Sequence, residues 1–290
     1  MTTLLHFVFS GLVVGGIYAL VGLGFTLTYD AMRIINVTQA EFVMLGGMLT
    51  AVLFGAGFPL WGAAVIAILI TIVVGLLMYR LTIAPAKEDD HVGLIIITFG
   101  VAIFIEGLTK VLFGKQMLQF PPFSGRESIP ILGINVQPQA IWMLVGALLV
   151  FLVLHVFQTR FLSGQAMRAT SANPLAANLV GIKTSRIIAM AFGISAAIGA
   201  IAGVLMTPIT LVRYDIGILL GIKGFAAAML GGLGNPLGAL VGGLLVGLLE
   251  SLGAGYISSA YKDAFAFIVL IGALTFLPHG LLGKKYVERV

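Results

Sequence analysis

The chain has 290 residues, of which 60% are hydrophobic and only 9% are charged. Soluble domains carry about 25% charged residues, and a soluble fold could not cover so apolar a core with so few polar side chains. Soluble enzymes and nucleic-acid-binding domains are therefore excluded, and the net charge of +5 is assigned to loops at a membrane surface, with no nucleic acid as partner. Because there is no cysteine, disulfides and thiolate metal sites are excluded as well.

The apolar runs predict an all-α, polytopic helical membrane protein. They are continuous over roughly 18 to 25 residues, the length that a helix needs to cross a bilayer, whereas a membrane barrel would show alternating strands of about ten residues. Nine windows qualify: 4–28, 39–57, 60–80, 93–113, 139–160, 185–207, 217–232, 236–254 and 262–279. We predict about 8–9 transmembrane helices with broken or re-entrant segments, in a single domain over residues 1–290. The short window 217–232, which contains Lys223, is as well explained by a broken or re-entrant helix as by a full pass.

The distribution of Lys and Arg predicts the orientation. If the N-terminus lies outside, ten of the sixteen basic residues fall in cytoplasmic segments, as the positive-inside rule favours. The loop 161–184 and the C-terminal Lys284 and Lys285 then face the cytoplasm.

Several short signatures predict helix ends. The segment Thr38–Glu41 has the form of a capping box. Asn173-Pro174 and Asn235-Pro236 each place an N-cap residue before a proline at the first helical position, and Gly181 occupies the place of a left-handed C-cap. A short helix therefore lies inside the loop 161–184.

That short helix carries Leu175 and Leu179 on one face and is too short to be stable alone in water. It must dock, either on the membrane surface or in a groove of a soluble partner. If the groove is apolar, Ala176→Asp or Ala177→Asp is expected to uncouple the partner while the membrane part stays folded.

The acidic residues near the apolar windows have structural explanations. Glu41 belongs to the capping box, Glu106 is placed for an ion pair with Lys110 one turn later, and Glu250 is placed to pair with Lys262. No acid then occupies a clear midplane position, which disfavours a stand-alone secondary transporter or channel.

The polar run Asn36, Thr38 and Gln39 joins two apolar segments. An uncharged polar solute would find hydrogen-bonding partners there, although a plain connecting loop explains the run equally well.

Catalytic and metal-binding patterns are missing from the sequence. Residues 107–116 loosely resemble a phosphate loop, but the spacing is wrong and no Ser or Thr follows the Lys. The four histidines are isolated, without the spacing of a metal site. We therefore expect no catalysis, no cofactor and no metal site on this chain.

The loop 161–184 resembles the cytoplasmic coupling segment of permease subunits of bacterial ABC importers for branched-chain amino acids. Residues 15–29, 36–47 and 231–239 also match that family, so the resemblance extends from about residue 8 to 283. With its short N-terminus the chain is most similar to the LivH-type permease subunits.

The resemblance implies a transmembrane permease in the bacterial cytoplasmic membrane, where the distribution of Lys and Arg places the N-terminus on the periplasmic side. It implies a second, LivM-type permease subunit, two cytosolic ATPases that carry the ATP and magnesium, and a periplasmic binding protein that delivers the solute. Urea, amide and aromatic-acid importers belong to the same superfamily, so these solutes remain alternatives to branched-chain amino acids. A membrane-embedded scaffold is a further alternative, from a different class.

The resemblance also assigns residues. On the coupling segment these are Gly164, Arg168, Ala169, Asn173, Pro174, Ala176, Ala177, Gly181 and Ile182. For the substrate pathway the candidates are Asn36, Thr38, Gln39, Gly232, Gly234 and Asn235.

Overall fold

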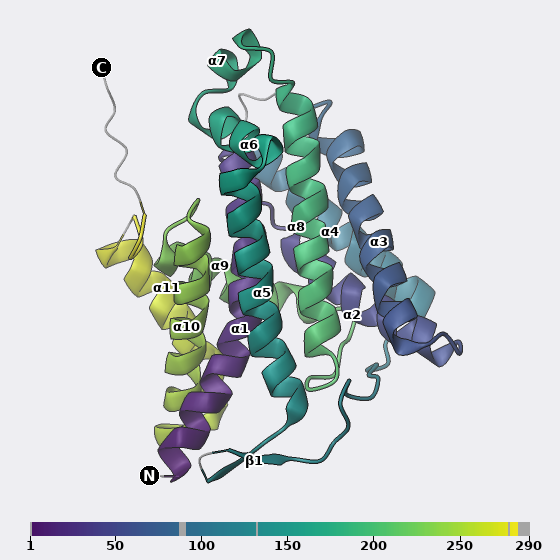
Figure 1. Cartoon of the computed structure of the whole chain (residues 1–290), viewed down its shortest axis with the longest axis vertical. Helices are drawn as coiled ribbons and strands as arrows, with labels where there is room; N and C mark the ends of the chain where they lie inside the picture. Colours follow the sequence, from purple (N-terminus) through teal and green to yellow (C-terminus); the bar gives the residue numbers. More distant parts are fainter. Residues whose placement is uncertain (1, 87–90, 132, 278, 284–290) are drawn as a thin grey trace.

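Long apolar helices dominate the computed structural model, which describes residues 2–86, 91–131, 133–277 and 279–283. The helices run mostly along the long axis of the molecule (Figure 1), with the N-terminus at one end and α6 and α7 at the other. The helices are α1 (Thr2–Met32), α2 (Gln39–Gly55), α3 (Leu60–Met78), α4 (His91–Phe113), α5 (Pro138–Arg160), α6 (Leu162–Ala172), α7 (Pro174–Leu179), α8 (Thr184–Met206), α9 (Ile216–Gly231), α10 (Pro236–Tyr256) and α11 (Lys262–Phe276). A π-helical turn, Tyr79–Ile83, extends α3, and a 3₁₀ turn, Ser259–Tyr261, precedes α11. Lys284 and Lys285 lie outside the described residues.

Seven of the described helices are long and apolar enough to cross a membrane, which confirms the polytopic helical prediction. Two of the nine predicted windows form shorter helices, α2 and α9. The sequence raised doubt about the second of these but not about α2. The reason lies in the connection after α1: the side chain of Gln39 packs against Gly24, eight residues before α1 ends at Met32. At 1.5 Å per residue, α2 therefore begins about 12 Å below the end of α1, inside the bundle.

Within the described part of the chain, a small hairpin at the N-terminal end of the bundle departs from the all-α fold (Figure 1). Strands β1 (Ile129–Ile131) and β2 (Ile134–Val136) pair antiparallel, with Ile129 opposite Val136. An isolated bridge between Leu118 and Val212 holds the same loop against the connection between α8 and α9. These short pairings satisfy backbone groups in the long loop between α4 and α5.

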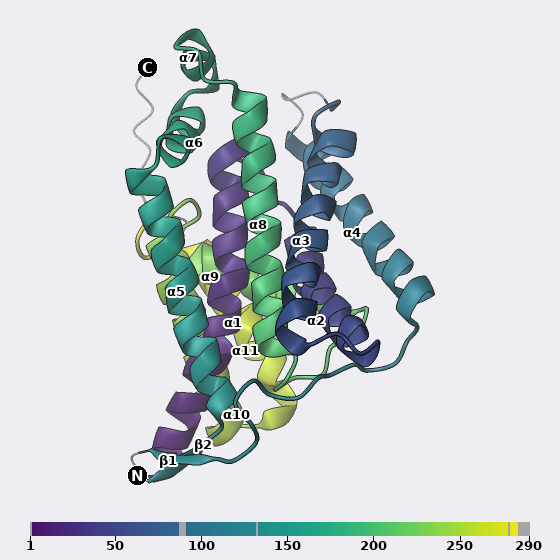
Figure 2. The same cartoon turned by 45° about the vertical axis from the view of Figure 1, so that its right-hand side comes forward.

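Helix α1 is central and packs on α5, α8, α9 and α10, while α3 and α4 form one side of the bundle (Figure 2). The glycine spacings of the sequence mark its closest approaches. Gly11 and Gly15 of α1 lie against Gly247 and Gly243 of α10, so close that an added Cβ at any of them would meet backbone atoms. Small residues at such spacing allow two helix backbones to approach closely inside a membrane.

Candidate functional site

The polar run between α1 and α2 lies inside the bundle. Asn36, Thr38 and Gln39 are completely buried. Thr38 donates its hydroxyl hydrogen to the carbonyl of Thr98 in α4 at 2.7 Å, and Gln39 donates from Nε2 to the carbonyl of Ser195 in α8 at 3.1 Å. The connection therefore ties α1, α4 and α8 together, which a plain surface loop would not do.

Glycines make room for these polar side chains. A Cβ at Gly24 of α1 would overlap the amide of Gln39, and a Cβ at Gly199 of α8 would press on the same residue. A Cβ at Gly217, in the first turn of α9, would overlap the carboxyl group of Glu41. We call residues 36–41 and the glycines that face them the polar hub. The geometry of the polar hub depends on glycines of α1, α8 and α9, which leave space because they have no side chain.

The predicted capping box is wrong. Thr38 is itself helical, with φ −65° and ψ −11°, and its side chain makes no capping hydrogen bond because the hydroxyl is engaged with Thr98. Glu41 is only 3% exposed, and neither its Oε2 nor the Nδ2 of buried Asn36 has a hydrogen-bond partner among the described residues. An acidic side chain thus does lie within the bundle, contrary to the prediction. Unpartnered buried polar atoms are costly, so the polar hub retains hydrogen-bonding capacity for something else.

The other predicted pathway residues lie elsewhere. Gly232 and Gly234 take positive φ values of 104° and 85° at the break between α9 and α10. Gly232 packs against the backbone of residues 279–283, and Gly234 lies beside Asp30 near the end of α1. Asp30 is six residues beyond Gly24, so the break is about 9 Å from the polar hub along α1. The structure does not bring the two groups of candidates together.

Asn235 acts at this break as the sequence predicted. Its Oδ1 accepts hydrogen bonds from the amides of Leu237 and Gly238, which caps α10. Its Nδ2 donates to the carbonyl of Leu282 at 2.8 Å, so the cap also holds the segment after α11.

The predicted coupling segment, residues 161–184, consists of an anchored helix and a projecting one. In α6, Met167 and Thr170 are buried, and Gly164 lies against the backbone of Phe157 and Gln158 in α5. A Cβ at Gly164 would overlap that backbone, which explains why glycine occupies this position. Arg168 and Ala169 are exposed on the same helix. Helix α6 is therefore fixed to the membrane bundle.

Helix α7 projects from the end of the molecule (Figure 1). Asn173 caps it by accepting from the amide of Ala176 at 3.0 Å, Pro174 occupies the first turn, and Gly181 has φ 91°, all as predicted. The exposed apolar side chains of this tip are Leu175, Leu179 and Val180. Ala176 is exposed, and Ile182, just after the tip, is half-buried.

Ala177 does not belong to that exposed face. It is only 3% exposed because it points into the structure rather than outward. The expectation that Ala177→Asp would act only on a partner is therefore wrong, since a carboxylate there would first disturb the contacts of α7 itself. Leu175 and Leu179 are the residues that a partner can reach.

A large pocket lies beneath α6. It has a volume of about 920 Å³ and is bounded by α6, the C-terminal ends of α1 and α5, the break before α10 and the segment after α11. Arg168 and Ala169 of the coupling segment line it together with Gly234 and Asn235. Residues that were predicted for coupling and for the pathway thus share one cavity.

An ion cluster that the sequence predicted only in part ties four helices together near the opposite end. Nζ of Lys223 lies 2.9 Å from Oε1 of Glu250 and 2.6 Å from Oδ1 of Asp263, and Tyr18 donates to Oε2 of Glu250 at 2.7 Å. The predicted pair of Glu250 with Lys262 is present at 3.5 Å. The contact with Lys223 was missed, although a lysine and a glutamate inside two apolar windows were a signal that they would pair.

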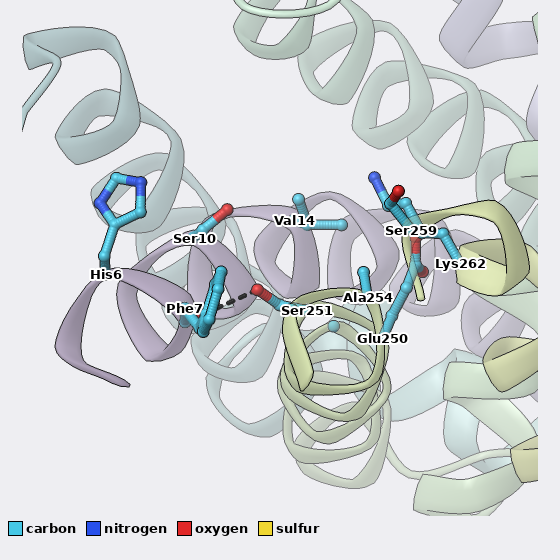
Figure 3. A pocket seen from close by; sticks show the side chains of 11 residues that line it. His6, Phe7, Ser10, Val14, Glu250, Ser251, Ala254, Ser259 and Lys262 are labelled. Carbon is cyan, nitrogen blue, oxygen red and sulfur yellow. Dashed lines mark hydrogen bonds and ion pairs between the residues drawn. The ribbon is translucent and has the colours of Figure 1, made fainter. Parts of the chain in front are cut away.

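A second pocket, of about 280 Å³, opens beside this cluster between α1 and α10 (Figure 3). Glu250, Lys262 and Ser251 line it, and the Ser251 hydroxyl donates to the carbonyl of Phe7 at 2.8 Å. Both carboxylate oxygens of Glu250 already have partners. The cluster therefore serves to hold α1, α9, α10 and α11 together.

The predicted ion pair between Glu106 and Lys110 is not among those that the structure gives for the described residues. Lys110 instead places its Nζ 5.2 Å from the ring centre of Tyr214, which follows α8. A cation above an aromatic face is favourable and needs no acidic partner.

Comparison with known proteins gives a match over nearly the whole chain. The family described as branched-chain amino acid transport system, permease component, matches residues 7–274. The high-affinity branched-chain amino acid transport system permease proteins LivH of Escherichia coli K12 and BraD of Pseudomonas aeruginosa are 32% and 33% identical, each over 97% of this chain and 96% of their own. The solved structure of PsaBC from Streptococcus pneumoniae in complex with Fab covers 96% of this chain and 91% of its own, with a TM-score of 0.46 at 15% identity.

Proposed function

The chain belongs to the family of branched-chain amino acid transport system permease components, and we propose that it is the permease subunit of an ABC importer for branched-chain or related aliphatic amino acids. The observation that carries the proposal is the arrangement of α6 and α7, in which an anchored α6 holds α7 with Leu175 and Leu179 exposed at the end of the bundle. Exposed apolar side chains on a short helix are typical of a segment that docks into a groove.

The proposed assembly contains a second permease subunit, of the LivM type, and two cytosolic ATPases that bind ATP and magnesium. A periplasmic binding protein supplies the solute. This chain contributes a single transmembrane permease domain with its coupling loop at 161–184, and it performs no hydrolysis itself. Ligand affinity then comes from the binding protein and the work comes from the ATPases, so the permease needs no tight internal site.

The proposed orientation places α7 in the cytoplasm and the N-terminus in the periplasm of a bacterial inner membrane. Four arginines lie in α6 or at the ends of the helices that meet near α6 and α7: Arg33, Arg160, Arg168 and Arg186. Basic residues that gather at one end of a helical bundle favour the cytoplasmic side for that end.

The proposed solute is zwitterionic or uncharged. The polar hub offers the amides of Asn36 and Gln39 and the carboxyl group of Glu41, with no described arginine or lysine among its hydrogen-bonding partners. A phosphorylated or dianionic solute would need cationic partners at low dielectric. Urea and amides, which are neutral, remain the alternative substrates on the same observation.

Transport by the reconstituted assembly tests the proposal. The chain is purified with its native partners through an affinity tag and placed in liposomes, and labelled leucine and urea are offered with the binding protein. We expect leucine to accumulate only when ATP and the binding protein are both present. Accumulation against a gradient by this chain alone would contradict the proposal, and ATP-driven uptake of urea but not leucine would select the alternative solute.

A further inference from the structure

The pocket of about 920 Å³ beneath α6, which we call the coupling pocket, is formed where the coupling segment meets the membrane bundle. Its walls come from the ends of α1 and α5, from α6, from the break before α10 and from the segment after α11. The lining includes Arg33, Gln158, Arg168, Asn235 and His279. We propose that the coupling pocket binds a phosphate group.

The lining has an excess of cationic and donor groups. Two guanidinium groups line it, that of Arg33 just after α1 and that of Arg168 in α6, and Asp30 is the only acidic residue among the lining residues that the structure describes. Guanidinium groups match phosphate because they present parallel N–H donors to two oxygens at once. His155 and His279 line the pocket too and can donate further hydrogen bonds.

A buried amide supports the assignment. Gln158 is only 6% exposed and lines the coupling pocket, yet its Nε2 donor has no hydrogen-bond partner among the described residues. A buried donor without an acceptor is destabilising by roughly 1–3 kcal/mol. Nε2 is enclosed by protein atoms in this conformation, so a rotation of the side chain toward the pocket would bring it to a phosphate oxygen.

Arg33 has an unusual backbone that directs it to this place. Its φ of 58° makes it the only described residue other than glycine with a positive φ. Its guanidinium group donates to the carbonyl of Ser171 in α6 at 3.3 Å and lies 5.5 Å from the ring centre of Tyr29. A strained conformation persists where surrounding contacts enforce it, and such positions cluster at functional sites.

The pocket implies a structural role for the phosphate. A ligand that contacts both Arg33, just after α1, and Arg168, in α6, joins α6 to the end of the central helix α1. Two sources have this chemistry at the end of a membrane protein: the headgroup of a phospholipid and free phosphate or a phosphorylated metabolite in the aqueous phase. Phosphate binding itself requires no transport. Only the role of α6 as a coupling element rests on the proposed function.

Binding measurements on the purified full-length assembly test the proposal directly. For the aqueous source, inorganic phosphate is titrated by calorimetry at constant ionic strength. For the lipid source, native mass spectrometry compares retention of phosphatidylglycerol with that of digalactosyldiacylglycerol, which has no phosphate. We expect saturable binding in one of these arms. Arg33→Gln and Arg168→Gln should each weaken it about ten-fold, the loss of one charge-assisted contact.

The matched controls are Arg160→Gln and Arg186→Gln, because both arginines are exposed near the same end but do not line the coupling pocket. They should change the affinity less than two-fold, because exposed charges outside the pocket contribute little to binding. If Arg33→Gln prevents folding, Arg168→Gln, at an exposed position of α6, still decides the question. No binding in either arm, or equal weakening by the controls, overturns the proposal. Failure of leucine uptake with intact phosphate binding would instead count against the proposed function alone.

Discussion

The position of a buried polar side chain in this bundle depends on glycines of the neighbouring helices. Gln39 can point into the core because Gly24 and Gly199 leave space for its amide, and the Ser195 hydroxyl lies 3.0 Å from the Gly24 carbonyl beside it. A buried polar side chain needs both a cavity of its own shape and hydrogen-bonding partners. At this position Gly24 provides the space, and Ser195 of α8 provides the hydrogen-bonding partners through its carbonyl and hydroxyl groups.

This arrangement predicts a specific coupling between two substitutions. Gly24→Ala should destabilise the protein by roughly 1–3 kcal/mol, because the new methyl group overlaps the Gln39 amide. The double variant Gly24→Ala with Gln39→Ala should recover part of that loss relative to the sum of the single changes. Thermal unfolding in detergent, measured by intrinsic fluorescence, gives the four values of the cycle.

The control for that cycle is Gly107→Ala. Gly107 also lies within a helix, but a Cβ there would meet nothing within 4 Å. We expect its unfolding temperature to stay the same or rise slightly, since alanine favours helix. Strict additivity of Gly24→Ala and Gln39→Ala would show that the two side chains do not compete for the same space.

Lys223 provides the second prediction at this scale. It is 4% exposed and contacts two carboxylates, so Lys223→Met leaves Glu250 buried with fewer cations and should cost about 3–5 kcal/mol. The control is Arg213→Ala, which breaks a partly exposed ion pair with Asp215 and should cost less than about 1 kcal/mol. Unfolding temperatures that fall equally in the two variants would show that burial does not distinguish these pairs.

At the scale of elements, the sequence predicted helix ends well where the cap is local. Asn173, Asn235 and Gly181 each act through groups within a few residues, so their type and spacing were sufficient. Thr38 was misread because its partner, Thr98, is 60 residues away in the chain. A local motif predicts a local bond only when no tertiary partner competes for the same atoms.

For the short helix α7, the structure shows which side chains are exposed, and spacing in the sequence does not. Spacing alone placed alanines and leucines of α7 on a docking face, whereas the structure turns Ala177 inward and leaves Leu179 89% exposed. Leu179→Asp should therefore abolish stimulation of ATP hydrolysis by the loaded binding protein while the unfolding temperature stays unchanged. The reason is that the carboxylate must lose its hydration in an apolar groove.

Two further variants separate docking from folding. Ala177→Asp should lower the unfolding temperature of the chain itself, because the position is already buried by its own neighbours. Met117→Asp, at an exposed apolar position in the loop between α4 and α5 near the opposite end, should affect neither quantity. If Leu179→Asp transports normally, α7 is a surface helix and the coupling assignment fails.

At the scale of the whole molecule, the sequence predicted the polytopic bundle but not how distant segments meet. Composition and window length were sufficient for the long helices because the bilayer imposes them. The contact between Tyr18 and Glu250 joins residues 232 positions apart. The coupling pocket likewise depends on five separate segments, and no pattern within one segment predicts such a meeting.

The proposed orientation is the last prediction, and the absence of cysteine from the sequence makes it simple to test. Gln165→Cys lies on α6 and Arg126→Cys lies in the loop between α4 and α5, and both positions are exposed. Helix α6 and that loop lie at opposite ends of the bundle (Figure 1). In intact spheroplasts, a membrane-impermeant maleimide should label Arg126→Cys and should leave Gln165→Cys unlabelled until the membrane is permeabilised. The helices fix both positions relative to each other. Labelling of Gln165→Cys alone in intact spheroplasts would therefore show that the whole bundle has the opposite orientation. That result would place α7 beyond the reach of any cytosolic ATPase.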